Sequence, residues 1–204
     1  MTLAPTTTDR GSETRRRILE VAAEAFADRG YAGTSVNDVL KASGVTKGGF
    51  YFHFPSKEAL ALATLRHKQE QWAAMVMAAV MRRPRAIEQL EAMVEALCDL
   101  HEQDRACRAI SRLCTELGDE HPELRPQLGT QLTTWMDIVA SIIRKGQDGG
   151  EIRTDVDPVM AAEVAVGSFI GLETVSQVLT GRADLRRRAR DFRDLWFAAI
   201  RQAT

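Results

Sequence analysis

The chain has few of the residues that define several common classes of protein. Its 204 residues include three cysteines, Cys98, Cys107 and Cys114, and no C-x-x-C pair. An odd number of cysteines argues against a disulfide framework. We interpret them as small buried hydrophobic residues, with a redox pair of Cys107 and Cys114 as the alternative. The four histidines form no i, i+4 ligand pair, so we predict no metal site.

The sequence also lacks long apolar runs. We find no run of the roughly 18 residues that a membrane span requires. The polar N-terminal stretch MTLAPTTTDRGSETRRR is unlike a secretory signal. We therefore expect a cytoplasmic protein with no membrane partner. No Ser/His/Asp set, paired carboxylates or Gly-rich phosphate loop is visible either, so we predict no enzyme, no catalytic residue and no cofactor.

The most informative stretch is GTSVNDVLKASGVTKGGFYFHFPSKEAL, residues 33–60. An S-x-x-D capping pattern begins a short helix at Ser35, and Gly44 is typical of its end. Thr46 caps a second short helix, which stops before Pro55. Two short helices joined by a tight turn containing glycine are typical of a helix-turn-helix, whose second helix enters the major groove of DNA.

The composition of the second helix is unusual for a purely structural element. Phe50 and Phe54 lie four residues apart and can face the core, which leaves Gly48, Tyr51 and Phe52 on the opposite side. Glycine costs about 1 kcal/mol relative to alanine in a helix interior, but it lets a backbone approach another surface closely. This composition favours DNA binding; the alternative is a solvated surface helix.

The run GVTKGGFYFHFPSKEAL, residues 44–60, closely resembles the signature of TetR-type one-component transcriptional regulators, A-G-V-S/T-x-G-x-L-Y-x-H-F-x-x-K-E-x-L. Phe50 replaces the usual Leu, and both are buried apolar residues. The variant T-K-G-x-x-Y-F-H-F also looks like the γ-butyrolactone receptor branch of that family. The resemblance implies an all-α fold, a homodimer, a double-stranded DNA operator and a small-molecule effector.

The resemblance also implies which residues face DNA. The predicted DNA-contact set is Thr34, Ser35, Thr46, Lys47, Gly48, Tyr51, Phe52, His53 and Lys57. Within it, Thr46, Lys47 and Gly48 are implied to approach base edges. Phosphate contacts are implied for Thr34, Tyr51, His53 and Lys57, and a sugar or thymine-methyl contact for Phe52. For Arg15, Arg16 and Arg17, the alternatives are a solvated face, an added phosphate contact or a basic arm.

The rest of the chain has helical periodicity without strand alternation. We expect helices over residues 12–30, 35–43, 47–54, 56–82, 85–103, 105–117, about 123–145, 158–180 and 183–202. The predicted organisation is a flexible tail (1–10), a helix-turn-helix domain (11–71) that includes the start of a connector helix, and an effector-binding and dimerisation domain (72–204).

The last two predicted helices have more apolar surface than one small body can cover. In the TetR family, the final two helices pair with those of a second chain in a four-helix bundle. The predicted interface residues are Gly167, Gly171, Val175, Phe192, Leu195 and Trp196. The alternative is that these residues fill an intrachain core.

The family also places an apolar effector cavity in the C-terminal body. The predicted lining is Met93, Leu97, Ile110, Leu113, Trp135, Val139 and Phe169, with Ser168 as a polar group. Trp135 resembles a pocket tryptophan of the γ-butyrolactone receptor branch, and core packing is its alternative role. Where that branch has a pocket glutamine on the connector helix, this chain has Lys68 followed by Gln69.

These features predict a ligand-responsive regulator, by family expectation a repressor. The effector would shift the connector helix, residues 56–82, and so change the separation of the two recognition helices. Within this class of regulators, a drug- or metabolite-responsive regulator of an efflux or catabolic gene is the second hypothesis. Outside the class, the sequence leaves open an enzyme with an appended helix-turn-helix and a dimeric binding module with a vestigial DNA role.

Overall fold

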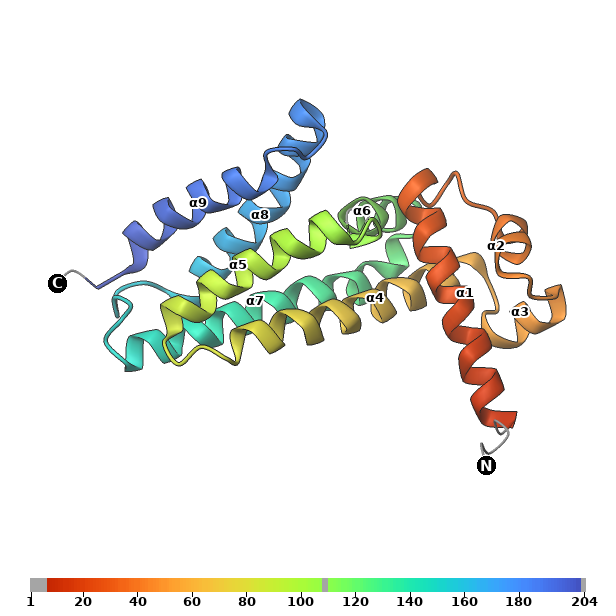
Figure 1. Ribbon diagram of the computed structural model, residues 1–204, viewed down its shortest axis with the longest axis horizontal. Coiled ribbons are helices and arrows are strands. Elements are labelled where there is room, and N and C mark those ends of the chain that lie inside the picture. Colours follow the sequence, from red (N-terminus) through yellow and green to blue (C-terminus); the bar gives the residue numbers. More distant parts are fainter. Residues whose placement is uncertain (1–6, 108–109, 203–204) are drawn as a thin grey trace. The chain divides into compact units, whose positions relative to one another are not determined.

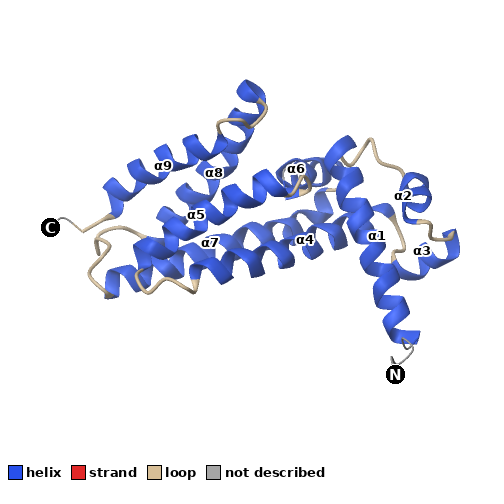
Figure 2. Cartoon of the chain, viewed as in Figure 1, coloured by secondary structure: helices blue, strands red, loops and turns tan. Residues whose placement is uncertain are grey.

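A computed structural model of the chain describes residues 7–107 and 110–202. Regular structure in these ranges is helical, apart from an isolated antiparallel bridge between Ile152 and Arg201 (Figures 1 and 2). The elements are α1 (Thr7–Arg29), α2 (Val36–Ser43), α3 (Lys47–His53), α4 (Lys57–Val80), α5 (Ala86–Gln103), α6 (Ile110–Glu120), the 3-10 helix η2 (Pro122–Leu124), α7 (Arg125–Asp148), α8 (Pro158–Thr180) and α9 (Leu185–Ile200). The prediction of an all-α fold is confirmed.

The chain divides into two compact units. The first contains Met1–Gln71 and Asp104–Leu128, and the second contains Trp72–Gln103 and Gly129–Thr204. The sequence-based boundary assigns residues 104–128 to the C-terminal domain instead. They belong to the first unit because Leu113 and Leu117 of α6 are buried in its core.

The core of the first unit forms beneath the helix-turn-helix. Phe26 from α1, Phe50 from α3 and Phe54 directly after α3 are at most 2% exposed. Tyr31 is equally buried. Its backbone N–H donates to a carboxylate oxygen of Glu116 at 2.6 Å. These contacts fix the short helices against α1.

Two helix ends differ from the sequence-based prediction. Helix α1 begins at Thr7 rather than at Ser12, because Gly11 weakens a helix without ending it. Of the predicted flexible tail, residues 7–10 are therefore helical, and residues 1–6 lie outside the described residues. Helix α7 continues past Gly146 to Asp148. A Cβ at Gly146 would lie 2.6 Å from Cδ1 of Ile152, so this glycine allows close packing and does not end the helix.

In the second unit, α8 and α9 are antiparallel neighbours, and α9 also packs on α5. Asp157 caps α8 by accepting hydrogen bonds from the N–H groups of Val159 and Met160, and Pro158 follows at the first helical position. Gly181 ends the helix in the left-handed conformation at φ 60°.

Helix α8 corrects our expectation about apolar runs. Within the described ranges it is the one helix long and apolar enough to cross a membrane by length and composition, with a mean hydropathy of 1.4. We missed it because Glu163 and Glu173 interrupt the apolar sequence without lowering its average enough. Only 22% of its most apolar window is buried within the chain.

Candidate nucleic-acid interface

Helix α2 begins with a complete capping box. The Ser35 hydroxyl accepts a hydrogen bond from the Asp38 N–H at 3.2 Å, and the Ser35 N–H donates to the Asp38 carboxylate at 2.9 Å. The Ser35 hydroxyl also donates to the Asp38 carboxylate at 2.7 Å, and this hydrogen bond, together with the one from the Ser35 N–H, lowers the pKa of Asp38. Gly44 ends the helix at φ 65°, and its N–H donates to the Leu40 carbonyl at 3.0 Å. The tight turn of the helix-turn-helix therefore depends on local hydrogen bonds and one left-handed glycine.

Helix α3 is anchored at both ends and from below. The Thr46 hydroxyl accepts a hydrogen bond from the Gly49 N–H at 3.2 Å, which caps the N-terminus. Phe50 is fully buried, and its carbonyl accepts the Phe54 N–H at 2.9 Å. The two rings pack with their centroids 5.8 Å apart. The predicted inward face of this helix is confirmed.

The two glycines of α3 differ in what surrounds them. A Cβ at Gly49 would lie 3.2 Å from Cγ1 of Val45 and 3.3 Å from the Thr46 hydroxyl, so Gly49 is needed for internal packing. A Cβ at Gly48 would meet nothing within 4 Å. Internal packing therefore does not explain Gly48, and its missing side chain leaves an exposed backbone that another surface can approach.

The outward face of α3 is polar and aromatic. Thr46, Lys47 and Gly48 are exposed at its leading end. Tyr51 is 45% exposed and Phe52 is 83% exposed. A large aromatic side chain this exposed costs free energy in an isolated chain, which suggests that a partner covers it.

The flanking members of the predicted set fall into different environments. The Lys57 ammonium lies 4.0 Å from the ring centroid of Tyr31 and remains half-exposed at the start of α4. The His53 ring packs edge-on against Phe52, with centroids 5.1 Å apart. Both side chains can reach solvent and remain candidates for phosphate contacts.

Thr34 departs from its predicted role. It is 1% exposed, and its hydroxyl donates to the carbonyls of Gly30 and Ala25 at 2.8 and 3.0 Å. The side chain joins the end of α1 to the loop before α2, so its hydroxyl is not placed to donate to a phosphate. We remove Thr34 from the DNA-contact set.

The arginines near the start of α1 differ in the contacts that they make. Arg16 forms an exposed ion pair with Glu13 at 2.7 Å. The guanidinium carbon of Arg15 lies 5.3 Å from the ring centroid of Phe54, directly after α3. Of the three arginines, Arg15 is therefore the one with a contact beside the helix-turn-helix.

The residues predicted to line the effector cavity do not all belong to one unit. Met93, Leu97, Trp135, Val139, Ser168 and Phe169 lie in the second unit, with Met93 and Val139 buried. Leu113 lies in the core of the first unit, where it borders a void of about 10 Å³, room for about one water molecule. This void is too small for an effector, so we remove Leu113 from the set. The side chain of Ile110 lies outside the described residues.

Some of the predicted dimer-interface residues are exposed, and others are buried within the chain. Leu195 is 75% exposed and Val175 is 42% exposed, and a Cβ at either Gly167 or Gly171 would meet nothing within 4 Å. Trp196 is only 8% exposed and stacks with Phe192, with centroids 6.3 Å apart. It points into the chain, so we assign Trp196 to the core and remove it from the interface.

Sequence reasoning missed two polar clusters, one buried and one partly buried. In the second unit, His101 and Glu173 are both buried, 3.5 Å apart, and the His101 ring packs edge-on against Phe169. The signal was an isolated glutamate in an apolar helix. In the first unit, the carboxylate of Glu20 contacts the Lys68 ammonium at 2.5 Å.

The environment of Glu20 stabilises its ionised form. Burial opposes ionisation, but hydrogen bonds from Lys68, His67 and Gln71 outweigh it and lower the pKa of Glu20 to about 2. The Lys68 ammonium also lies 3.8 Å from Asp104. Lys68 is thus committed to carboxylates within the first unit.

The described residues show neither a reactive thiol nor a cluster of metal ligands. Burial raises the pKa of the Cys98 and Cys114 thiols to about 11, which disfavours the reactive thiolate. In the part of the chain that the structure describes, Cys98, Cys107 and Cys114 form no disulfide. Over residues 7–107 and 110–202, no group of three His, Cys, Asp or Glu side chains is placed to hold a metal ion.

A capped helix-turn-helix on an α1 scaffold, with a polar and aromatic outer face on its second helix, defines a DNA-binding protein of the helix-turn-helix class. Residues 18–64 match the family described as "Bacterial regulatory proteins, tetR family", and residues 86–192 match the "Tetracyclin repressor-like, C-terminal domain". The chain therefore belongs to the TetR family of transcriptional regulators, whose members are not enzymes.

Individual relatives support this assignment. The chain is 34% identical to the A-factor receptor protein of Streptomyces griseus over 187 residues, which cover 87% of this chain and 60% of that protein. It is 29% identical to the regulator UidR of Escherichia coli K12, over 78% of this chain and 79% of UidR.

Solved structures show the same fold. One, described as "Molecular basis for control of antibiotic production by a bacterial hormones", has 35% identity and a TM-score of 0.81, and covers 93% of this chain and 98% of its own. TylP of Streptomyces fradiae has 31% identity and a TM-score of 0.78, covering 95% and 89% respectively.

Proposed function

We propose that this protein is a repressor that binds a palindromic operator as a homodimer and is released by a small apolar effector. The observation that carries the proposal is the outer face of α3. Lys47, Tyr51 and Phe52 are exposed on a helix whose opposite face is fully buried. Because the backbone of this helix is held by its buried face, DNA binding would order only the exposed side chains and not the helix itself.

The proposed DNA contacts follow from position on α3. Thr46, Lys47 and Gly48 at the N-terminal end approach base edges, since recognition helices enter the major groove by that end. Tyr51, His53 and Lys57 donate to phosphates, and Phe52 packs on a sugar or a thymine methyl group. Ser35, at the exposed N-cap of α2, contacts the phosphate backbone of the DNA.

The exposed apolar residues of α8 and α9 support a dimer. Val178 is 77% exposed, Leu179 is 65% exposed and Leu195 is 75% exposed. Burying these side chains against a second copy of the chain would stabilise the dimer by about 25 cal/mol for each Å² of apolar surface removed from water. Two-fold symmetry would then present two copies of α3 to the two halves of a palindrome. Leu195→Asp should give a monomer in light scattering, whereas Leu132→Asp, at an exposed position in α7, should leave the dimer intact.

The proposed effector is small and mainly apolar, and binds in the second unit among Met93, Leu97, Trp135, Val139 and Phe169, with Ser168 as a polar group. Similarity to the A-factor receptor protein supports a γ-butyrolactone-like signal. One observation favours a different metabolite or drug. Lys68 stands where that branch has a pocket glutamine, and its ammonium is held by Glu20. Because the chain acts on chromosomal DNA in this proposal, we place it in the cytoplasm.

Selection of genomic DNA fragments bound by the purified protein, repeated with candidate effectors, tests this function directly. We expect enrichment of an inverted repeat whose half-sites lie about one helical turn or a multiple of it apart. We also expect that at least one effector abolishes the enrichment. A protein that enriches no inverted repeat, with or without effectors, contradicts the proposal. A binding module with a vestigial DNA role would give that negative result.

A further inference from the structure

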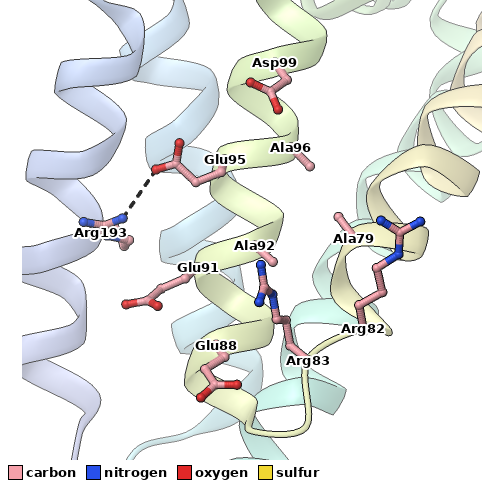
Figure 3. A pocket seen from close by; sticks show the side chains of 10 residues that line it. All are labelled: Ala79, Arg82, Arg83, Glu88, Glu91, Ala92, Glu95, Ala96, Asp99 and Arg193. Carbon is pink, nitrogen blue, oxygen red and sulfur yellow. Dashed lines mark hydrogen bonds and ion pairs between the residues drawn. The ribbon is translucent and has the colours of Figure 1, made fainter.

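A groove on the second unit is lined by charged side chains of both signs. It has a volume of about 450 Å³ and is lined by α5, by the end of α4, by the α4–α5 connection and by one residue of α9 (Figure 3). This volume lies within the range of small-molecule sites, about 300–1,000 Å³. The ten lining residues are Ala79, Arg82, Arg83, Glu88, Glu91, Ala92, Glu95, Ala96, Asp99 and Arg193.

One part of the groove is already neutralised by α9. Glu95 accepts hydrogen bonds from Arg186 and Arg190 at 2.9 and 2.8 Å, and Arg193 lies 3.5 Å from the same carboxylate. Arg186 also contacts Asp99 at 2.6 Å. These pairs fasten α9 to α5 and leave no charge for a ligand.

The other part keeps its charges separate. Arg82 and Arg83 are exposed, and across the described ranges neither guanidinium has a carboxylate within ion-pair distance. Glu88 is half-exposed in the first turn of α5. Glu91 has one long contact, 3.6 Å to Arg201. Guanidinium and carboxylate groups thus border one groove without pairing across it.

The floor of the groove is apolar and shallow. Ala79, Ala92 and Ala96 place only methyl groups there, and Figure 3 shows the Arg83 side chain extending from the α4–α5 connection toward Ala92. A short hydrocarbon chain can lie on such a floor while charged groups at its two ends meet the arginines and the carboxylates that border the groove.

We propose that this groove binds a small zwitterion, with its carboxylate on Arg82 and Arg83 and its ammonium group on Glu88 and Glu91. Guanidinium groups bind carboxylates through paired N–H donors, and an ammonium group donates to carboxylates. The contacts are exposed to solvent, so the affinity is about millimolar and falls with added salt. The groove shares no residue with the proposed DNA and effector sites.

Ligand-observed NMR with the full chain at low ionic strength tests the proposal. The probe is 6-aminohexanoate, compared with hexanoate, which lacks the ammonium group, and with hexylamine, which lacks the carboxylate. We expect each single-charge analogue to bind at least about tenfold more weakly, which corresponds to about 1.4 kcal/mol. Equal binding of the zwitterion and either analogue, or no binding of the zwitterion, overturns the proposal.

Variants locate the site. Arg83→Gln and Glu88→Gln should each weaken binding of 6-aminohexanoate at least about fivefold, while thermal melting confirms that both variants fold. Arg85→Gln is the matched control, since Arg85 lies in the same connection but pairs with Glu151 at 3.4 Å and does not line the groove. An unchanged affinity in both groove variants, or an equal loss in the control, contradicts this assignment.

Discussion

Replacing Gly48 by alanine separates the demands of folding from those of DNA binding. The added methyl group would meet nothing within 4 Å inside the chain. Alanine is favoured over glycine in helices by up to about 1 kcal/mol, and Gly48 lies in the first turn of α3, so we expect a gain of about 0.5 kcal/mol. For a chain of this size the melting temperature should rise by about 1–2 °C.

The same substitution should weaken operator binding. In the proposed complex the backbone at Gly48 approaches a base edge, and a methyl group inserted into a close-packed contact costs about 1–3 kcal/mol. Operator affinity should therefore fall by about 5- to 150-fold. Fluorescence anisotropy with the selected operator at one fixed salt concentration measures this change, and differential scanning calorimetry measures the stability.

Gly49→Ala provides the matched comparison on the same helix. Its methyl group would lie 3.2 Å from the Val45 side chain, so it should reduce the stability gain or reverse it. The reasoning is refuted if Gly48→Ala lowers the melting temperature, or if operator affinity is unchanged in a variant that folds normally. The second result would place the DNA surface elsewhere.

Four further changes test other parts of the structure. Lys57→Ala should reduce the slope of log affinity against log salt by about one unit for all DNA sequences, and an unchanged slope would remove Lys57 from the phosphate contacts. Gly44→Ala should destabilise the protein by about 1 kcal/mol in urea unfolding, since Gly44 has φ 65°; a neutral effect would contradict the left-handed turn. Glu20→Gln should cost about 1–2 kcal/mol at pH 7. The contribution of Glu20 is complete above its unfolded pKa of 4.5 and is lost as the pH falls through about 2, so variant and parent should converge there; a constant difference would contradict the ion pair with Lys68. Trp135→Ala should abolish the effector response in a reporter assay with operator binding retained, and loss of both would assign Trp135 to the core.

Much of the helix-turn-helix could be predicted because its signals are local. The capping box at Ser35, the left-handed Gly44, the cap at Thr46 and the inward spacing of Phe50 and Phe54 each involve residues within four positions of one another. Such interactions are encoded in short sequence patterns and do not depend on which distant segments fold against them.

Longer-range features were less predictable. The sequence suggested that Thr34 faces a phosphate, but the end of α1 offers its hydroxyl two carbonyl acceptors. Leu113 has the same apolar character as the predicted cavity residues, yet its helix packs into the first unit. Trp196 and Leu195 are adjacent on α9, and only their packing distinguishes a core residue from an exposed one.

By itself, the sequence determined the helical class of this protein, the position of its recognition helix and the family to which that helix belongs. The tertiary structure decided which of the predicted side chains remain available for binding. The reason is that caps and turns are set by neighbouring residues, whereas burial and pairing depend on segments far apart in the chain. Glu20 with Lys68, and Glu95 with Arg190, become partners only when their helices pack together.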